Sequence, residues 1–131
     1  MADIFRINPP DLAPPPGNRF AHVVRWGNRV WIAGQTARRK DGTVVGLGDP
    51  RAQAEQVYDN LRIAIGAVGG TLANIVKVTI FLTSEASLAA ARAAQNECWG
   101  NNPLPASSMV IVKALAQPDY LIEIEAEGVI D

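Results

Sequence analysis

The sequence has very few of the residues that build metal sites, disulfides and catalytic triads. It contains one cysteine, Cys98, and one histidine, His22. A single cysteine cannot form an internal disulfide, and a zinc site or a Ser-His-Asp triad is very hard to assemble from so few ligands and bases. The composition therefore argues against most metallohydrolase and triad chemistry.

The sequence also lacks a long apolar run and an excess of charge. Residues 1–6 have neither the basic start nor the apolar stretch of a signal peptide, and no run elsewhere approaches membrane-spanning length. Twelve basic and 13 acidic residues give a formal net charge of −1, which carries no signal for polyanion binding. We therefore expect a cytoplasmic protein that contacts neither membrane nor nucleic acid.

The residues that are present suit one domain. A chain of 131 residues buries about two-thirds of its unfolded surface, which is enough for one core. Five of the nine prolines fall within residues 8–18, where fixed φ angles and missing amide donors favour an extended connector. We expect a single domain over residues 1–131.

Hydrophobic periodicity and turn residues predict the order of elements. Strands are expected at 4–7, 20–26, 30–35, 44–45, 75–82, 105–115 and 120–128. Helices are expected from Pro50, with Asp49 as N-cap, to about residue 68, and again over 87–99. One sheet with two helices predicts an α+β fold.

Two of these elements have an informative pattern. The strand at 75–82 is expected to turn Val76, Val78, Ile80 and Leu82 to one face, opposite Lys77 and Thr79. The second helix is expected to carry Leu88, Arg92, Gln95 and Trp99 on one stripe. Arg92 would then lie on the same packed face of the helix as the apolar side chains of Leu88 and Trp99.

The last predicted strand alternates apolar residues with glutamates. Ile122, Ile124 and Ala126 point to one face, and Glu123, Glu125 and Glu127 point to the other. Ionised carboxylates need water, cations or a polar cavity. Two helices cover only one face of such a sheet, and the other face is also expected to hold Trp31, Met109 and Ile111. We infer that copies of the chain cover this face and leave clefts between subunits.

Four segments resemble the Rid (YjgF-type) family. They are Ala33 to Gln35, Gln53 to Leu61, Val76 to Thr83, and Ile122 to Ala126. Similarity in matching order runs from about Phe20 to Val129. It implies a chorismate-mutase-like fold, a homotrimer, and sites in the clefts between subunits.

The resemblance also implies a chemistry and its residues. Well-known members hydrolyse reactive enamines and imines to 2-keto acids and ammonia without a cofactor. Glu123 matches the glutamate that orients a catalytic water, and Gly34 matches a glycine whose backbone lines the cleft. Phe20 and Ala33 match cleft positions where the deaminases have hydroxyl-bearing residues.

One position departs from the deaminase pattern. Ser107 stands where that branch has an arginine that clamps the substrate carboxylate, so this chain resembles a divergent branch. Ser107 and Met109 are expected to line the cleft, and Arg92 is a candidate replacement clamp. Residues 38–40, Arg-Arg-Lys, are a loop cluster that could steer an anionic ligand toward the cleft.

Two functions follow as alternatives. The first is a Rid-like hydrolase of an imine, an enamine or a related small metabolite, with Glu123 as its catalytic group. The second is a non-catalytic trimer that binds a small metabolite or regulates a partner enzyme. Under the second, Glu123 would form a salt bridge across the trimer, to Lys77 or Lys113, and Arg92 would be a surface residue.

Overall fold

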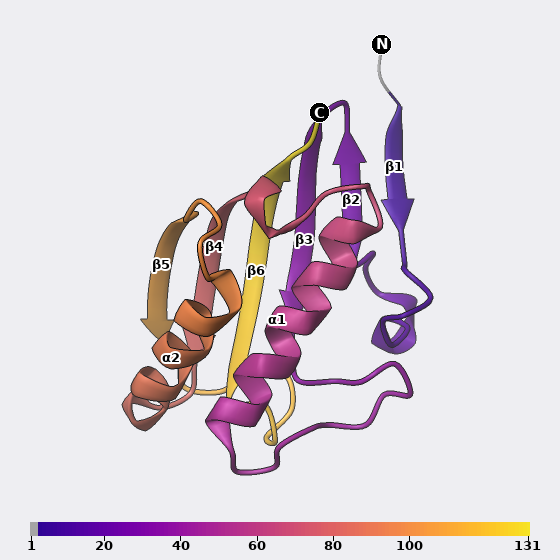
Figure 1. The fold of residues 1–131 in the computed structure, drawn as a ribbon. Coiled ribbons are helices and arrows are strands. Elements are labelled where there is room, and N and C mark those ends of the chain that lie inside the picture. Colours follow the sequence, from indigo (N-terminus) through magenta and orange to yellow (C-terminus); the bar gives the residue numbers. More distant parts are fainter. Residues whose placement is uncertain (1–2) are drawn as a thin grey trace.

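Six strands form one mixed sheet that is crossed by two helices (Figure 1). The computed structural model describes residues 3–131. The strands are β1 (Ile4–Ile7), β2 (Val23–Trp26), β3 (Arg29–Gln35), β4 (Ile75–Leu82), β5 (Ala106–Ile111) and β6 (Ile122–Val129). The helices are α1 (Pro50–Gly66) and α2 (Leu88–Trp99), and short 3-10 turns lie at Pro16–Asn18, Leu72–Asn74 and Glu85–Ser87. The strand order across the sheet is β1-β2-β3-β6-β4-β5.

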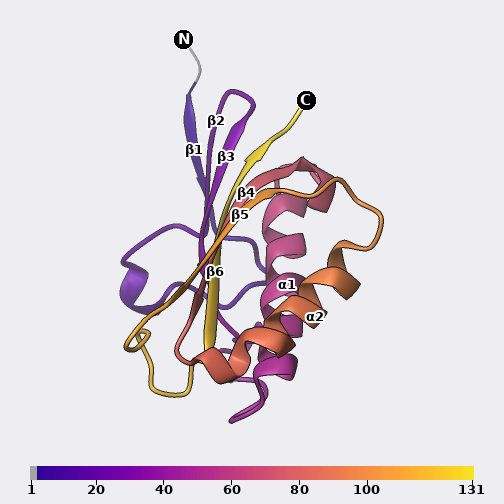
Figure 2. The ribbon, with the colours of Figure 1, turned by 90° about the vertical axis from the view of Figure 1, so that its left-hand side faces the viewer.

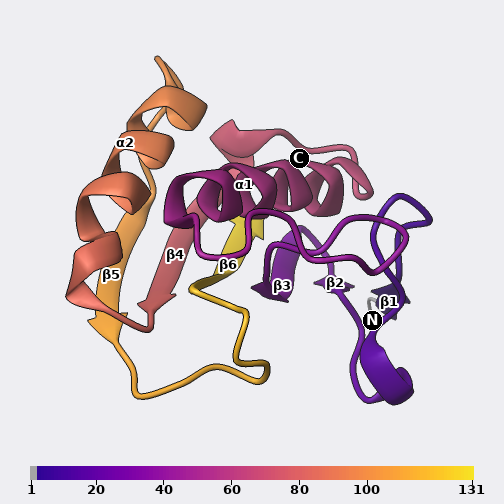
Figure 3. The same ribbon diagram turned by 90° about the horizontal axis from the view of Figure 1, so that it is seen from below.

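Both helices pack on the same face of the sheet (Figure 2). Seen from below, α1 lies over the middle of the sheet and α2 over the β4 and β5 side (Figure 3). The core between these layers is apolar, and its fully buried members include Val57, Leu61, Ile65, Val78, Ile80, Leu82, Ile122 and Ile124. Burying each such side chain contributes about 1.5–3 kcal/mol. The predicted α+β fold with two helices on one face is confirmed.

Local sequence signals account for the first hairpin and for the start of α1. Gly27, with φ of 59°, and Asn28 separate β2 from β3 as predicted, although β2 begins three residues later than expected. The Asp49 carboxylate accepts hydrogen bonds from the backbone N–H groups of Arg51 and Ala52, both at 3.1 Å. Pro50 occupies the first turn of α1, where its missing N–H costs no hydrogen bond.

Three details of the predicted elements are wrong. A bulge in β4 shifts the register between Ile75 and Lys77, so Ile75 is buried and Val76 is exposed. The expected strand at 44–45 is only one bridge, between Arg38 and Val44. In α2, Trp99 is buried and Leu88 packs against the core as expected, but Arg92 is exposed and the buried face is completed by Ala91 and Ala94.

The pairing of β5 with β4 corrects a fourth prediction. The two strands are parallel, with Val78 opposite Ser107, Ile80 opposite Met109 and Leu82 opposite Ile111. Paired residues in neighbouring strands point to the same face, and Met109 packs against the core. Met109 and Ile111 therefore lie on the helix side of the sheet, not on the face that carries the glutamates.

No helix within residues 3–131 combines the length and the hydropathy that a bilayer crossing requires.

Candidate functional site

The face of the sheet away from the helices carries the glutamates of β6. Glu123, Glu125 and Glu127 alternate with buried Ile122, Ile124 and Ala126, as the sequence predicted. Their neighbours on β4 are Phe81, Thr79 and Lys77, in that order. Lys77 donates a hydrogen bond to the Ser108 hydroxyl at 3.0 Å. Within residues 3–131 none of the three glutamates forms a salt bridge.

Glu123 lies directly over Gly34 of β3. A Cβ atom added to Gly34 would lie 2.7 Å from both Cδ and Oε2 of Glu123, which is closer than carbon atoms approach in proteins. Only glycine at position 34 leaves this space free, so the glycine allows the Glu123 side chain to lie over β3. Among residues 3–131 no side chain or backbone group forms a hydrogen bond with the Glu123 carboxylate.

The surroundings of Glu123 favour its protonated form. Partial burial raises the pKa of Glu123 above its usual range, and the nearby Glu125 carboxylate raises it further. Burial disfavours the charged form because water is lost, and a like charge adds repulsion. A carboxyl group tuned in this way holds a proton more readily than an exposed glutamate does, which suits it to relay protons in hydrolysis.

A hollow of about 300 Å³ opens beside Glu123. Its walls come from the proline-rich arm, the end of β3, the following loop and the segment before β6. The lining residues are Pro16, Arg19, Phe20, Gly34, Thr36, Arg38, Ala116, Gln117, Tyr120 and Glu123. Three residues predicted from the sequence therefore meet in one hollow: Phe20, Gly34 and Glu123. The volume is at the lower end of the range for small-molecule sites.

Two buried amides of α1 hold the loops that line this hollow. Asn60 donates hydrogen bonds to the carbonyls of Thr36 at 3.0 Å and Arg38 at 2.9 Å. Gln53 donates to the carbonyl of Asp119 at 2.8 Å and accepts from the N–H of Leu121 at 2.9 Å. Both residues belong to the segment that carries the family resemblance, so their fixed positions keep the walls of the hollow in place.

His22 is a buried structural residue that packs against Phe20, a lining residue of the hollow. Its Nε2 lies 2.6 Å from the Ala13 carbonyl, and its Nδ1 lies 3.1 Å from Nε2 of Gln35. These contacts fit a neutral ring that donates through Nε2 and accepts through Nδ1. The Phe20 ring packs edge-on against the His22 ring, with centroids 5.6 Å apart, so His22 supports an aromatic wall of the hollow.

The structure separates the other predicted site residues from Glu123 within one chain. Ser107 and Met109 point to the opposite face of the sheet because of the β4 and β5 register. Arg92 is exposed on α2, which also lies on that opposite face. Ala33 precedes Gly34, where the register between β3 and β6 shifts, and its N–H donates to the His22 carbonyl at 2.9 Å.

Two arginines of the hollow were missed as site residues. Arg38 had been placed only in a steering cluster, and Arg19 had been given no role. Both lie in segments without regular periodicity, and only their placement in the fold brings them beside Glu123. The only feature of the sequence that could have identified Arg19 and Arg38 as site residues is their positive charge next to the proline-rich arm and the end of β3.

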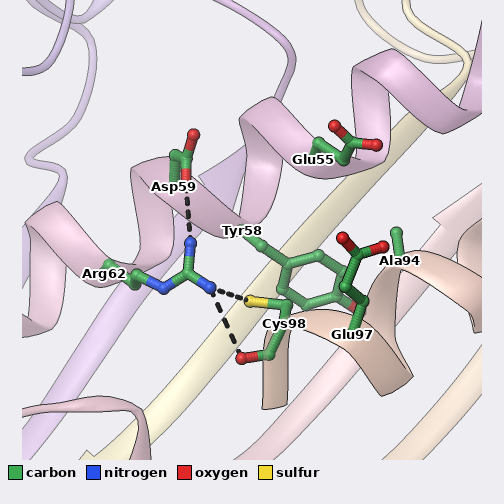
Figure 4. A pocket seen from close by; sticks show the side chains of 7 residues that line it. All are labelled: Glu55, Tyr58, Asp59, Arg62, Ala94, Glu97 and Cys98. Atoms are coloured by element: carbon green, nitrogen blue, oxygen red, sulfur yellow. Dashed lines mark hydrogen bonds and ion pairs between the residues drawn. The ribbon is translucent and has the colours of Figure 1, made fainter. Parts of the chain in front are cut away.

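A second hollow, of about 280 Å³, lies between the two helices (Figure 4). Arg62 donates to Asp59 at 2.6 Å and to the Cys98 sulfur at 2.8 Å. Burial raises the pKa of the Cys98 thiol despite the neighbouring guanidinium, so the thiol is a poor nucleophile. The buried Tyr58 hydroxyl also borders this hollow and has no hydrogen-bond partner among residues 3–131.

Comparison with known proteins relates this sequence and fold to one family. Residues 11–130 match the family described as Endoribonuclease L-PSP. A 2-iminobutanoate/2-iminopropanoate deaminase of Dermatophagoides farinae is 30% identical over 126 residues, which are 96% of this chain and 97% of that protein. A RutC family protein of Pyrococcus horikoshii is 35% identical over 115 residues, 87% of this chain and 89% of that protein.

Solved structures give the same result at the level of fold. The crystal structure of the YjgF gene product of Escherichia coli matches with a TM-score of 0.88 and 30% identity, over 95% of this chain and 98% of that chain. The architecture is thus that of the YjgF structures, an α+β sheet with two helices on one face. The chain belongs to the Rid/YjgF/RutC family.

Proposed function

We propose that the protein hydrolyses the C=N bond of a small reactive imine or of the enamine that tautomerises to it. The observation that carries this proposal is the Glu123 carboxyl group, which is half-buried, has a raised pKa, forms no salt bridge within residues 3–131 and lies beside a hollow of about 300 Å³. The name of the Dermatophagoides relative, a 2-iminobutanoate/2-iminopropanoate deaminase, supports the same chemistry. No group other than water and one carboxylate is needed for the reaction.

The proposed reaction has two steps. Ionised Glu123 accepts a proton from a water molecule while the water oxygen bonds to the imine carbon, and the π electrons of the C=N bond move to nitrogen. The protonated carboxyl then returns the proton to that nitrogen. In the second step the hydroxyl proton of the resulting carbinolamine moves through the Glu123 carboxylate to the amino nitrogen, and the C–N bond breaks as the C=O bond forms, so the products are a 2-oxo compound and ammonia.

We also propose that three copies of the chain complete the site. Within residues 3–131 the edge strand β5 pairs only with β4, and its Val110 and Ile111 are 42% and 46% exposed. Exposed apolar edges of this kind are normally covered. Ser107 and Met109 cannot meet Glu123 in one chain, so they would line the same cleft only if a neighbouring copy brought its β5 there. Size-exclusion chromatography with light scattering tests this, and a monomer would contradict it.

The test of catalysis uses imines that an amino-acid oxidase or dehydratase generates in the cuvette, with ammonia release as the signal. We expect Glu123→Gln to lower kcat/KM by about 100-fold or more. Glu127→Gln is the matched control because Glu127 lies on the same face, does not line the hollow and is not among the groups that raise the Glu123 pKa. It should retain turnover. Equal turnover by wild type and Glu123→Gln would contradict the assignment.

The alternative function is a trimer that binds a small metabolite without converting it. The observation that favours it is Ser107, at the position where the deaminase branch of the family has its carboxylate-binding arginine. Saturable binding of imino acid analogues together with no ammonia release from any imine would support this alternative.

A further inference from the structure

The hollow between the two helices contains a buried hydroxyl group. Tyr58 is 1% exposed, and among residues 3–131 its oxygen has no hydrogen-bond partner. Burying a hydroxyl group in this way costs free energy, because its hydrogen bonds to water are lost. Figure 4 shows the Tyr58 ring reaching from α1 toward α2, where Ala94, Glu97 and Cys98 border the same hollow. The hydroxyl group therefore points to a polar ligand that this hollow accommodates.

The Tyr58 ring is held in position by α2. Trp99 packs edge-on against it, with ring centroids 5.8 Å apart, and the Trp99 indole N–H donates to the Pro103 carbonyl at 2.9 Å. Burial raises the pKa of Tyr58, so its hydroxyl group stays neutral and can both donate and accept a hydrogen bond. A hydroxyl group fixed in this way loses little entropy when it accepts from a ligand.

The rim of the hollow is acidic. Its charged lining residues are Glu55, Asp59, Glu97 and Arg62. Arg62 pairs with Asp59, and Arg51 pairs with the two glutamates, so three carboxylates and two guanidinium groups leave one net negative charge. Each pair uses one oxygen of its carboxylate, and the other oxygen can accept a hydrogen bond from a ligand. The hollow therefore favours a cation.

The shape of the hollow limits the size of this cation. Its volume of about 280 Å³ suits a molecule of a few carbon atoms. Ala94 and the Tyr58 ring supply apolar surface, and the face of an aromatic ring attracts a cation. A primary ammonium group has three N–H donors, which suffice for the Tyr58 oxygen and for carboxylates such as Glu97.

We propose that the hollow between α1 and α2 binds a small primary amine, whose ammonium group donates hydrogen bonds to the Tyr58 hydroxyl and the Glu97 carboxylate. This site lies on the helix side of the sheet, and Glu123 lies on the other side. The inference is therefore independent of the proposed hydrolysis of C=N bonds.

The single cysteine serves as the reporter of binding. Cys98 borders the hollow and is the only cysteine of the chain, so its alkylation by iodoacetamide, followed by mass spectrometry, measures access to this site. The probe is butan-1-amine at constant pH and ionic strength, and calorimetry gives its Kd. We expect the amine to slow alkylation of the full-length protein until the site is saturated.

Two control ligands separate charge from hydrogen bonding. Butan-1-ol has the same carbon chain without the charge, and the tetramethylammonium ion has the charge without an N–H donor. Neither should protect Cys98 at concentrations where butan-1-amine does, because the proposed site needs both properties.

Substitutions then locate the amine. Tyr58→Phe removes only the hydroxyl oxygen and should weaken butan-1-amine binding by about 10-fold, because a buried charge-assisted hydrogen bond is lost. Glu97→Gln should weaken it by about threefold, because Glu97 is exposed and solvent screens its charge. Glu85→Gln is the matched control and should leave the Kd within about twofold. Glu85 is exposed just before α2 and does not line the hollow.

A measurement without the amine tests the same hydroxyl group. Tyr58→Phe removes a buried polar atom that lacks a partner, so the melting temperature should stay the same or rise. A lower melting temperature of Tyr58→Phe would show that the hydroxyl group is already satisfied in the free protein, and it would overturn the inference.

The binding outcomes are equally decisive. Protection of Cys98 that is lost in Tyr58→Phe and kept in Glu85→Gln would sustain the inference. Equal protection by butan-1-ol and butan-1-amine, equal affinity of wild type and Tyr58→Phe, or no protection by the amine would overturn it. None of these results depends on imine turnover, so failure of this inference is distinguishable from failure of the proposed function.

Discussion

The two faces of the sheet differ although the same strands supply both. On the helix side, Ile122, Ile124 and Ala126 of β6 are buried against α1 and α2 in a core that one chain completes. On the other side, Glu123, Glu125 and Glu127 of that strand have no salt bridge within residues 3–131. One face therefore stabilises the fold, and the other keeps polar groups available for a ligand.

The difference shows how the chain separates stability from chemistry. Successive side chains of a strand point to opposite faces of the sheet. Residues on one face can therefore be substituted while the side chains on the other face stay the same. The connection between the faces comes from Gln53 and Asn60, the buried amides of α1 that hold the loops of the hollow. The helix thus contributes apolar side chains to the core and hydrogen bonds to the site.

The largest expected effect tests the helix side. Ile124→Ala should reduce the free energy of unfolding by about 2–5 kcal/mol, because it leaves a cavity at a fully buried position. Glu125→Ala, one residue away on the other face, should change it by only about 0.5 kcal/mol or less. Urea denaturation at one fixed protein concentration measures both. Equal losses would mean that the second face is packed as tightly as the first.

A smaller effect on stability is expected where the open face is most crowded. Gly34→Ala places a methyl group 2.7 Å from the Glu123 carboxylate, which can move away because it ends a flexible side chain. Unfolding should become easier by only about 1 kcal/mol, while imine turnover should fall by about 10-fold or more because the carboxylate is displaced.

The control for Gly34→Ala is Gly66→Ala, which makes the same chemical change at the end of α1, where an added Cβ meets nothing within 4 Å. It should leave turnover unchanged and stabilise the helix slightly. A parallel loss of activity in the two variants would show that steric contact with Glu123 is not the cause.

The smallest expected effect is the pH dependence of stability that Glu123 causes. Its pKa is raised in the folded protein, so the folded state binds this proton more tightly than the unfolded chain does. The resulting stabilisation is present at acid pH and is lost as pH rises through the folded-state pKa. Glu123→Gln should therefore be more stable than wild type at pH 7, and the gap should close toward pH 4. A gap that widens on acidification would contradict the raised pKa.

The sequence predicted those features that depend on neighbours along the chain. Alternation placed the glutamates of β6 on one face, and Asp49-Pro50 marked the start of α1. The bulge at Val76 could not be found in this way, because an extra residue in β4 becomes visible only against its partner strand β6. The parallel pairing that turns Met109 to the core likewise depends on long-range register.

The sequence predicted only part of the candidate site, because some of its residues are brought together by contacts between distant parts of the chain. Phe20, Gly34 and Glu123 were named through family resemblance, and they lie together in the hollow. Arg19 and Arg38 lie in irregular segments, and the sequence has no periodic signal that would place them there. The hydrogen bonds of Asn60 to the Thr36 and Arg38 carbonyls explain their position, and those contacts span more than 20 residues.

The position of β6 in the sheet has a consequence for folding. The last strand in chain order lies between β3 and β4, which have no pairing with each other. Until residues 122–129 are available, the β1 to β3 meander and the β4 and β5 pair remain two half-sheets with open edges. The sheet can form only once residues 122–129 are available, and pairing between strands so distant in the sequence favours slow folding. Before β6 pairs, the open strand edges of the two half-sheets are therefore the parts of the chain most exposed to aggregation.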